Sequence, residues 1–176
     1  SWGYTVRSSL ESLDGLEGDF ECVASELRGG LQPMGGYHFQ RQDGTPVWFF
    51  GDTAWRAFST DLAKKHDREA VRHYLDVRSA QGFNYISVDV MGGGGIASRE
   101  PVFDSFHQEM IRPDFFQEVD KRLRYANVRG ITVGLVLAWH RGVPAWESFR
   151  SQEARLRYAR YMVGRYSAFD VLFIVS

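Results

Sequence analysis

Polar and aromatic side chains directly follow three apolar runs of this chain. The three stretches are 47–55, 83–91 and 131–141, and each begins with apolar residues. The side chains near their ends are Asp52, Trp55, Asp89, Trp139, His140 and Arg141. Carboxylates hydrogen-bond hydroxyl groups, indole rings stack on the apolar faces of sugars, and a cation pairs with a carboxylate. Together these residue types predict a carbohydrate-binding site.

Most of these candidates also have a structural interpretation. Asp52 could cap the segment that follows it. Trp55 and Trp139 could belong to the hydrophobic core. Asp89 could form an ion pair with Arg141 instead of contacting a ligand. We expect more than one of the six side chains to contact a ligand, and the sequence leaves open which ones.

Three other kinds of site lack sequence support. His140 could be a general base or a metal ligand, but no second histidine lies at a metal-ligand spacing such as i, i+4. The glycine run 92–95 is followed neither by Gly-Lys-Ser/Thr nor by a spaced Gly-x-Gly-x-x-Gly pattern, so we interpret it as a flexible rim loop and not as a phosphate site. No Gly-x-Ser-x-Gly motif of serine hydrolases is present. We therefore expect neither a metal nor a cofactor.

Strands and helices alternate in the part of the chain that must position these side chains. The three stretches and a fourth apolar run, 171–176, are predicted as strands, because continuous apolar runs suit strands covered on both faces. Helices are predicted at about 67–81, 113–130 and 151–166 from apolar spacing and from capping residues. This order indicates a parallel sheet with right-handed crossovers, and ligands of such sheets bind at the carboxyl ends of the strands.

An open doubly wound sheet and a closed barrel both have this alternation. A long segment, 52–66, separates the first strand from the first helix, whereas a nucleotide-binding open sheet usually has a tight glycine-rich turn there. Long loops after the strands are typical of barrels. The predicted fold class is therefore α/β, the N-terminal half of a (β/α)8 TIM barrel with four of its strands, preceded by a short β-hairpin segment.

Residues 1–36 differ in pattern from residues 37–176. Short strand-like pieces at 3–7 and 19–23 are followed by a segment rich in glycine and proline. We predict that 1–36 is the end of a preceding β-sandwich domain plus a linker. We predict that 37–176 is the first half of the barrel domain.

The composition limits which classes of binding partner we expect. The net charge of −1 and the pI near 6.5 give no broad attraction for nucleic acid or an anionic membrane, and we expect neither as a partner. Cys22 is the single cysteine, so a disulfide within the chain is impossible. The visible chain shows neither a signal segment nor a membrane span, which leaves its compartment open with a lean towards the cytoplasm. The oligomeric state is not predicted.

Four segments resemble the apiosidase-like family of glycoside hydrolases. They are 37–46, the Gly-Asp-Thr-Ala-Trp block at 51–55, 74–84 and 130–135. The resemblance implies a (β/α)8 barrel that hydrolyses glycosidic bonds of an oligo- or polysaccharide with two carboxyl groups and retains the anomeric configuration. It places the acid/base after the fourth strand and the nucleophile after a later strand, so both catalytic carboxyls are expected beyond residue 176. Their identities are unknown, and the chain alone is expected to be inactive.

The candidate residues match the family to different degrees. Asp52 and Trp55 correspond to the motif of the first strand, whereas Asp89 and the stretch 139–141 match by position only. Two alternatives stay open at this point. One is a carbohydrate-binding module without catalysis, and the other is a nucleotide-binding α/β domain that uses the glycine run.

Overall fold

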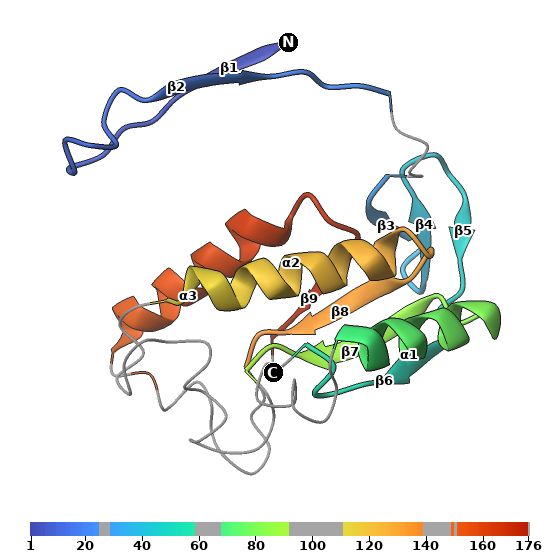
Figure 1. The fold of residues 1–176 in the computed structure, drawn as a ribbon. Coiled ribbons are helices and arrows are strands. Elements are labelled where there is room, and N and C mark those ends of the chain that lie inside the picture. The colour runs from blue at the N-terminus through green and yellow to red at the C-terminus, as the bar shows by residue number, and fades with distance from the viewer. Residues whose placement is uncertain (25–28, 59–67, 92–110, 139–148, 150, 176) are drawn as a thin grey trace. The chain divides into compact units, whose positions relative to one another are not determined.

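The computed structural model describes residues 1–24, 29–58, 68–91, 111–138, 149 and 151–175 (Figure 1). The chain forms two compact units, Ser1–Pro46 and Val47–Ser176. The first unit is built from short strands, and the second alternates strands with helices. The division into a preceding domain at 1–36 and a barrel domain at 37–176 stays a prediction.

The first unit contains two antiparallel strand pairs. Strands β1 (Trp2–Thr5) and β2 (Glu17–Phe20) form one pair, and β3 (Leu31–Met34) and β4 (His38–Arg41) form the other, which β5 (Pro46–Val47) extends. The segment predicted as a linker thus contains β3. Pro33 fits there because β3 is the edge strand of its sheet and does not need every backbone N–H for pairing.

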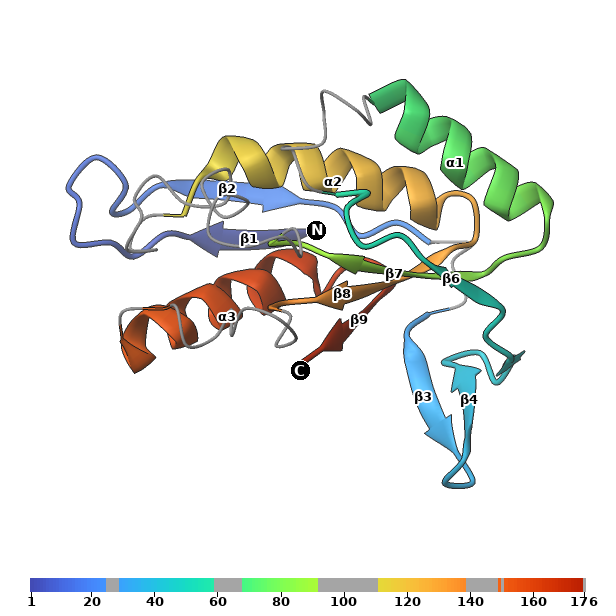
Figure 2. The same cartoon turned by 90° about the horizontal axis from the view of Figure 1, so that it is seen from below.

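The second unit is a four-stranded parallel sheet with three helices. The strands are β6 (Gly51–Thr53), β7 (Tyr85–Asp89), β8 (Thr132–Val136) and β9 (Val171–Ile174), and they lie side by side in chain order (Figure 2). The helices are α1 (Arg68–Ala80), α2 (Pro113–Asn127) and α3 (Gln152–Tyr166). The predicted alternation of strand and helix is confirmed.

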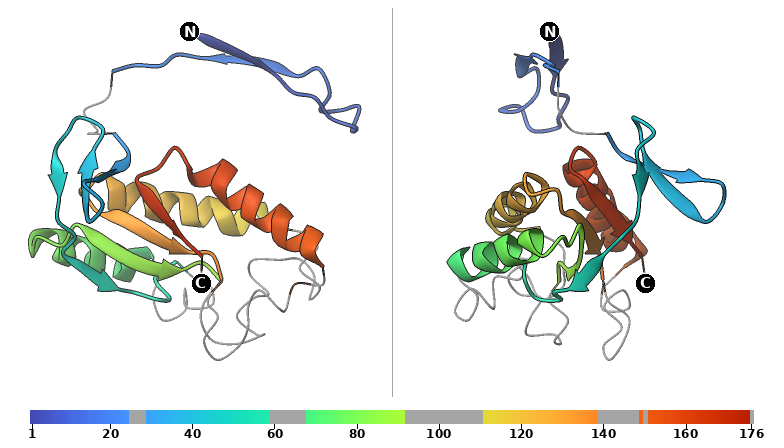
Figure 3. Two further views of the ribbon diagram at one scale, coloured as in Figure 1. Left: turned by 180° about the vertical axis from the view of Figure 1, so that it is seen from behind. Right: turned by 90° about the vertical axis from the view of Figure 1, so that its right-hand side faces the viewer.

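All three helices cover the same face of this sheet (Figure 3). Right-handed crossovers that always step in one direction place every helix on one side, whereas a doubly wound sheet reverses its strand order and carries helices on both sides. The order β6-β7-β8-β9 contains no reversal. This arrangement is that of a barrel wall, with the helices outside.

The strand register separates the helix face from the opposite face. Residues paired across parallel strands share a face, and successive residues of a strand alternate. Ile86 pairs with Val133, and both are buried in the core with side chains of α2 such as Val119 and Leu123. Ser87 pairs with Gly134 on the opposite face, which corresponds to the inside of the barrel.

The helix ends follow from local chemistry. Ser151 caps α3 by accepting a hydrogen bond from the Ala154 amide at 3.1 Å, and Pro113 opens α2. Gly82 and Gly130 follow α1 and α2 with φ angles of 85° and 73°, a conformation that glycine adopts without steric cost. No helix among the described residues is long and apolar enough to cross a membrane.

Strand β6 begins later than the apolar run at 47–50 suggested. The Asn84 side chain accepts a hydrogen bond from the Phe50 amide at 2.8 Å and donates one to the Trp48 carbonyl at 2.7 Å. Trp48 is 81% exposed and Phe50 is 50% exposed. The prediction that this run is a strand covered on both faces is therefore wrong for 48–50.

Candidate functional site

Asp89 is a buried carboxylate at the carboxyl end of β7. Its side chain is 1% exposed, and its Oδ1 accepts a hydrogen bond from the Met91 amide at 3.0 Å. Alternation from Ile86 and Val88, which lie in the helix-side core, assigns Asp89 to the opposite face of the sheet. This position is where parallel barrels place ligand-binding groups.

Trp55 lies next to Asp89 through the backbone. The Asp89 amide donates a hydrogen bond to the Trp55 carbonyl at 3.0 Å, and the Trp55 side chain is 39% exposed. The structure thus brings these two predicted site residues together, one after β6 and one at the end of β7. An indole and a carboxylate on two residues joined in this way would offer a stacking surface and a hydrogen-bond acceptor for a polar ligand.

Arg122 of α2 holds the turn that begins at Trp55. Its guanidinium is 5% exposed and donates a hydrogen bond from Nη1 to the Ala57 carbonyl at 2.8 Å. Phe58, the last described residue of this turn, is 1% exposed. The turn is therefore held by the hydrogen bond from the buried Arg122 and by the burial of the Phe58 side chain. Glu118 lies 3.5 Å from the Arg122 Nε.

Asp52 lies on the other face of the sheet from Asp89. Its register partner is Ile86, a residue of the helix-side core. The Asp52 Oδ2 accepts a hydrogen bond from the Tyr74 hydroxyl at 2.9 Å and pairs with the Arg78 Nη2 at 2.6 Å, both from α1. These contacts favour a link between strand and helix, and the expected sugar contact of Asp52 stays a prediction that they do not support.

Hydrogen bonds shift the titration of Asp52. The Thr53 amide donates to its Oδ1 at 2.7 Å, and this bond, with those from Tyr74 and Arg78, lowers the pKa of the Asp52 carboxyl against the opposing effect of burial. Asp52 is therefore held as a carboxylate. Its charge is paired with Arg78 of α1 within the folded chain.

Trp139, His140 and Arg141 lie outside the residues that the structure describes, as does the glycine run 92–95. Their predicted roles stay predictions. Strand β8 ends at Val136, and the two described residues that follow it, Leu137 and Ala138, are buried. Leu137 directly follows Val136, which is the register partner of Asp89.

A family model described as the apiosidase-like catalytic domain matches residues 34–176, which is more than half of the chain. The chain belongs to the apiosidase-like family. The resemblance noted in the sequence is thereby confirmed. No curated protein matches the chain.

Solved structures resembling this apiosidase-like chain include glycoside hydrolases. A candidate glycoside hydrolase from Bacteroides vulgatus is 22% identical with a TM-score of 0.72, and the match covers 98% of this chain and 37% of that one. A glycoside hydrolase of family 5 from the same species is 19% identical with a TM-score of 0.63, with 85% and 33% covered. The chain thus spans about a third of the length of these structures. The likeness confirms the predicted fold, the N-terminal half of a (β/α)8 barrel.

The inner face of the apiosidase-like sheet carries a second polar pair. The hydroxyl groups of Tyr85 and Ser87, four and two residues before Asp89 on the same strand, lie 2.9 Å apart. The Tyr85 ring crosses Gly134 of β8, where an added Cβ would overlap the hydroxyl. Within the described part of the chain, no group of three histidine, cysteine or acidic side chains is placed to hold a metal.

Sequence reasoning missed two side chains that support the site. Arg122 and Tyr158 both lie among apolar residues on the inner faces of their helices, and both are buried. A polar group at an apolar position of a helix is the signal that could have found them, because such a group needs a hydrogen-bond partner.

Proposed function

We propose that this chain forms part of the substrate site of a glycoside hydrolase that acts on an oligo- or polysaccharide. The observation that carries the proposal is the buried carboxylate of Asp89 beside Trp55, at the carboxyl ends of β7 and β6, in a chain of the apiosidase-like family. Asp89 would accept hydrogen bonds from sugar hydroxyls, and Trp55 would stack on a sugar face.

The proposed reaction is a double displacement with two carboxyl groups. One carboxylate attacks the anomeric carbon while an acid protonates the leaving oxygen, and water then releases the sugar with its configuration retained. The acid/base would follow β9, the fourth strand of the barrel, and the nucleophile would come from a later strand, as the family resemblance implies. Asp89 would hold the sugar through bonds that tighten in the transition state. We propose the same contribution for His140 and Arg141, with Trp139 as an aromatic wall.

The test is a hydrolysis screen of the full-length protein, which would carry both catalytic carboxyls, with a panel of 4-nitrophenyl α- and β-glycosides and with cell-wall polysaccharides. Release of nitrophenol or of reducing ends is the expected result. Proton NMR of the first product would show the retained anomer. An inverted anomer would remove the double-displacement mechanism and leave the hydrolase assignment in place. Absence of both cleavage and sugar binding would remove the proposed function.

A carbohydrate-binding role without cleavage is the second candidate. The 39% exposure of Trp55 favours it, because an exposed indole can stack on a sugar without any catalytic group. Sugar binding with no product in the screen would select this candidate. A nucleotide-binding role loses support, since the described strand order contains no reversal at which such sheets bind dinucleotides.

A further inference from the structure

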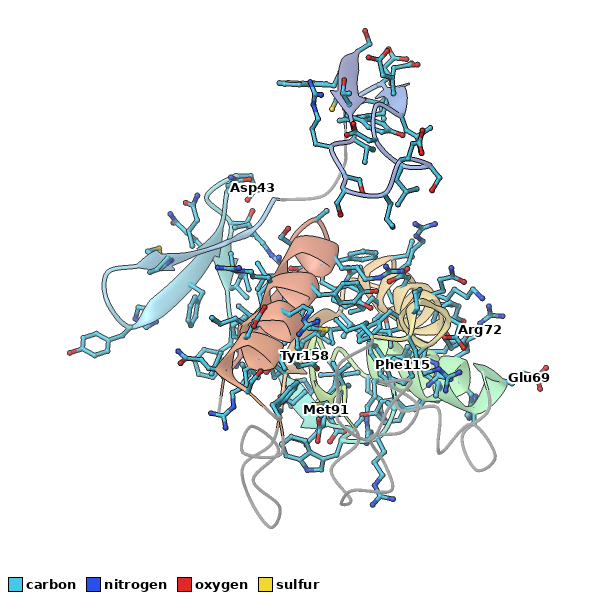
Figure 4. The ribbon with its side chains drawn as sticks, turned by 90° about the vertical axis from the view of Figure 1, so that its left-hand side faces the viewer. Asp43, Glu69, Arg72, Met91, Phe115 and Tyr158 are labelled. Atoms are coloured by element: carbon cyan, nitrogen blue, oxygen red, sulfur yellow. The ribbon has the colours of Figure 1, made fainter. Side chains whose placement is uncertain are left out.

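Tyr158 of α3 is bonded to the end of β8. Its side chain is 1% exposed, and its hydroxyl donates a hydrogen bond to the Leu137 carbonyl at 2.8 Å. The Leu137 amide donates to the Ile174 carbonyl of β9 at 3.2 Å. Both backbone groups of Leu137 are therefore held, one by the helix and one by the neighbouring strand. Figure 4 labels Tyr158 and Met91, the residue whose amide bonds Asp89.

The ring of Tyr158 reaches a second residue of the same connection. Phe149 is 3% exposed, and its ring centroid lies 5.4 Å from that of Tyr158. Leu137 directly follows β8, and Phe149 lies shortly before α3, at the other end of the connection between the two elements. One tyrosine thus touches the chain where it leaves the sheet and where it returns to the helix.

The burial of the Tyr158 hydroxyl favours a stable hydrogen bond to the Leu137 carbonyl. Burial raises the pKa of Tyr158 well above its usual value, and the charge of Asp89 raises it further. The phenol therefore remains a donor at every physiological pH. A buried hydroxyl without a partner is costly, so the Leu137 carbonyl is held firmly in this geometry.

We propose that Tyr158 is a positioning residue, which fixes the carboxyl end of β8 beside Asp89. Leu137 follows Val136, the register partner of Asp89, so a shift at Leu137 changes the spacing between the two strand ends that face a ligand. Tyr158 does not contact the substrate. The inference rests on the proposed function, because it assigns a role to the same strand ends.

Tyr166 provides a matched control on the same helix. It is fully buried, and its hydroxyl donates to the Phe116 carbonyl of α2 at 3.3 Å. It lies eight residues after Tyr158, about 12 Å further along the helix, towards the amino ends of the strands. Substitution by phenylalanine removes one oxygen atom at either position and keeps the ring.

The experiment compares Tyr158→Phe with Tyr166→Phe. Amide hydrogen exchange of Leu137 is measured by NMR, and kcat and KM are measured on the same panel of 4-nitrophenyl glycosides. We expect Tyr158→Phe to speed Leu137 exchange by about tenfold or more and to lower kcat by about tenfold with KM within about threefold. Tyr166→Phe should leave the Leu137 exchange rate and kcat within about threefold of the wild type.

Two results would overturn the inference. One is an unchanged Leu137 exchange rate in Tyr158→Phe. The other is an equal loss of kcat in both variants, which would show a general effect of lost stability. If the wild-type protein cleaves none of the glycosides, the proposed function fails on this panel, and the exchange comparison alone decides whether Tyr158 positions the strand end.

Discussion

Asp89 is buried at the carboxyl end of strand β7, so the effect of replacing this single residue can be predicted. Asparagine has nearly the same shape, so Asp89→Asn removes the charge and keeps most of the packing. We expect kcat/KM on a cleaved glycoside to fall by about tenfold or more, because a charged acceptor bonds sugar hydroxyls more strongly than a neutral one. The melting temperature of each variant provides the control for folding. Activity close to that of the wild type would remove Asp89 from the site.

Asp52 gives the opposite prediction, an effect on stability and its pH dependence. Its pKa is lowered in the folded state by the Thr53 amide first and by Tyr74 and Arg78. A lowered folded pKa gives stability that is complete above the unfolded pKa and is lost as the pH falls through the folded pKa. We expect Asp52→Asn to lower the free energy of unfolding by about 1–2 kcal/mol at neutral pH.

The difference between Asp52→Asn and the wild type should begin to shrink as the pH falls below about 4, where the carboxyl of the unfolded chain becomes neutral, and should disappear below the lowered pKa of the folded chain. Urea unfolding at about pH 7 and about pH 3 measures it. Turnover of the variant on a cleaved glycoside should stay within about threefold of the wild type, because the side chain faces α1. A stability difference that is the same at both pH values would contradict this role of the ion pair.

The contrast between these two aspartates marks the limit of the sequence at residue scale. Both follow apolar runs, so position alone treated them alike. A strand turns successive side chains to opposite faces, and a shift by one residue exchanges the helix face for the barrel interior. The run at 47–50 gave no guide to which residues face the helices, because it lies before the parallel ladder, which begins at Gly51. The partner residues of α1 could not be read from the motif at 51–55.

At the scale of an element, Gly134 and Tyr85 make β7 and β8 fit each other. The Tyr85 ring occupies the space above Gly134, so a methyl group there would displace it. We expect Gly134→Ala to lower the free energy of unfolding by about 1–3 kcal/mol through overpacking. Tyr85→Val empties this space, and the double variant should recover about 0.5 kcal/mol or more relative to additivity. Purely additive free energies in a double-mutant cycle would show that the two residues do not compete for space.

Element boundaries were predictable where one residue type has one physical reason to be there. Ser151 accepts the bond that caps α3, Pro113 stands at the first turn of α2, and glycine follows both α1 and α2 at positive φ. Strand β3 was not predictable, since glycines flank it and Pro33 lies within it, and only its pairing with β4 identifies it as a strand. Propensity describes the local chain, whereas strand pairing depends on a partner elsewhere.

For the whole molecule, the order of elements fixed the fold class more firmly than any single motif. Alternating strands and helices joined by right-handed crossovers leave a barrel or an open sheet as choices. The strand order β6-β7-β8-β9 favours the barrel. Strand order depends on which strands pair, and the sequence pattern does not contain that information. The buried supports Arg122 and Tyr158 belong to the same scale, because each connects a helix to a strand end distant in sequence.

The two units of the chain differ in how far their apolar side chains are buried. We predict from this difference that they unfold independently. In the first unit, Trp2 and Phe20 are register partners on one face of the β1-β2 hairpin and are 63% and 51% exposed. The buried core of the described residues lies wholly within the second unit. A two-stranded hairpin is at best marginally stable by itself in water.

Deletion of residues 1–24 should therefore leave the main thermal transition of the second unit within about 2 °C of its position in the full chain. Differential scanning calorimetry of the two proteins measures this shift, and far-UV circular dichroism checks that the helices are retained. The apolar face of the hairpin would then contribute nothing to the stability of the sheet and helices. A fall of about 5 °C or more would contradict independent unfolding, since such a shift corresponds to about 1–2 kcal/mol for a domain of this size.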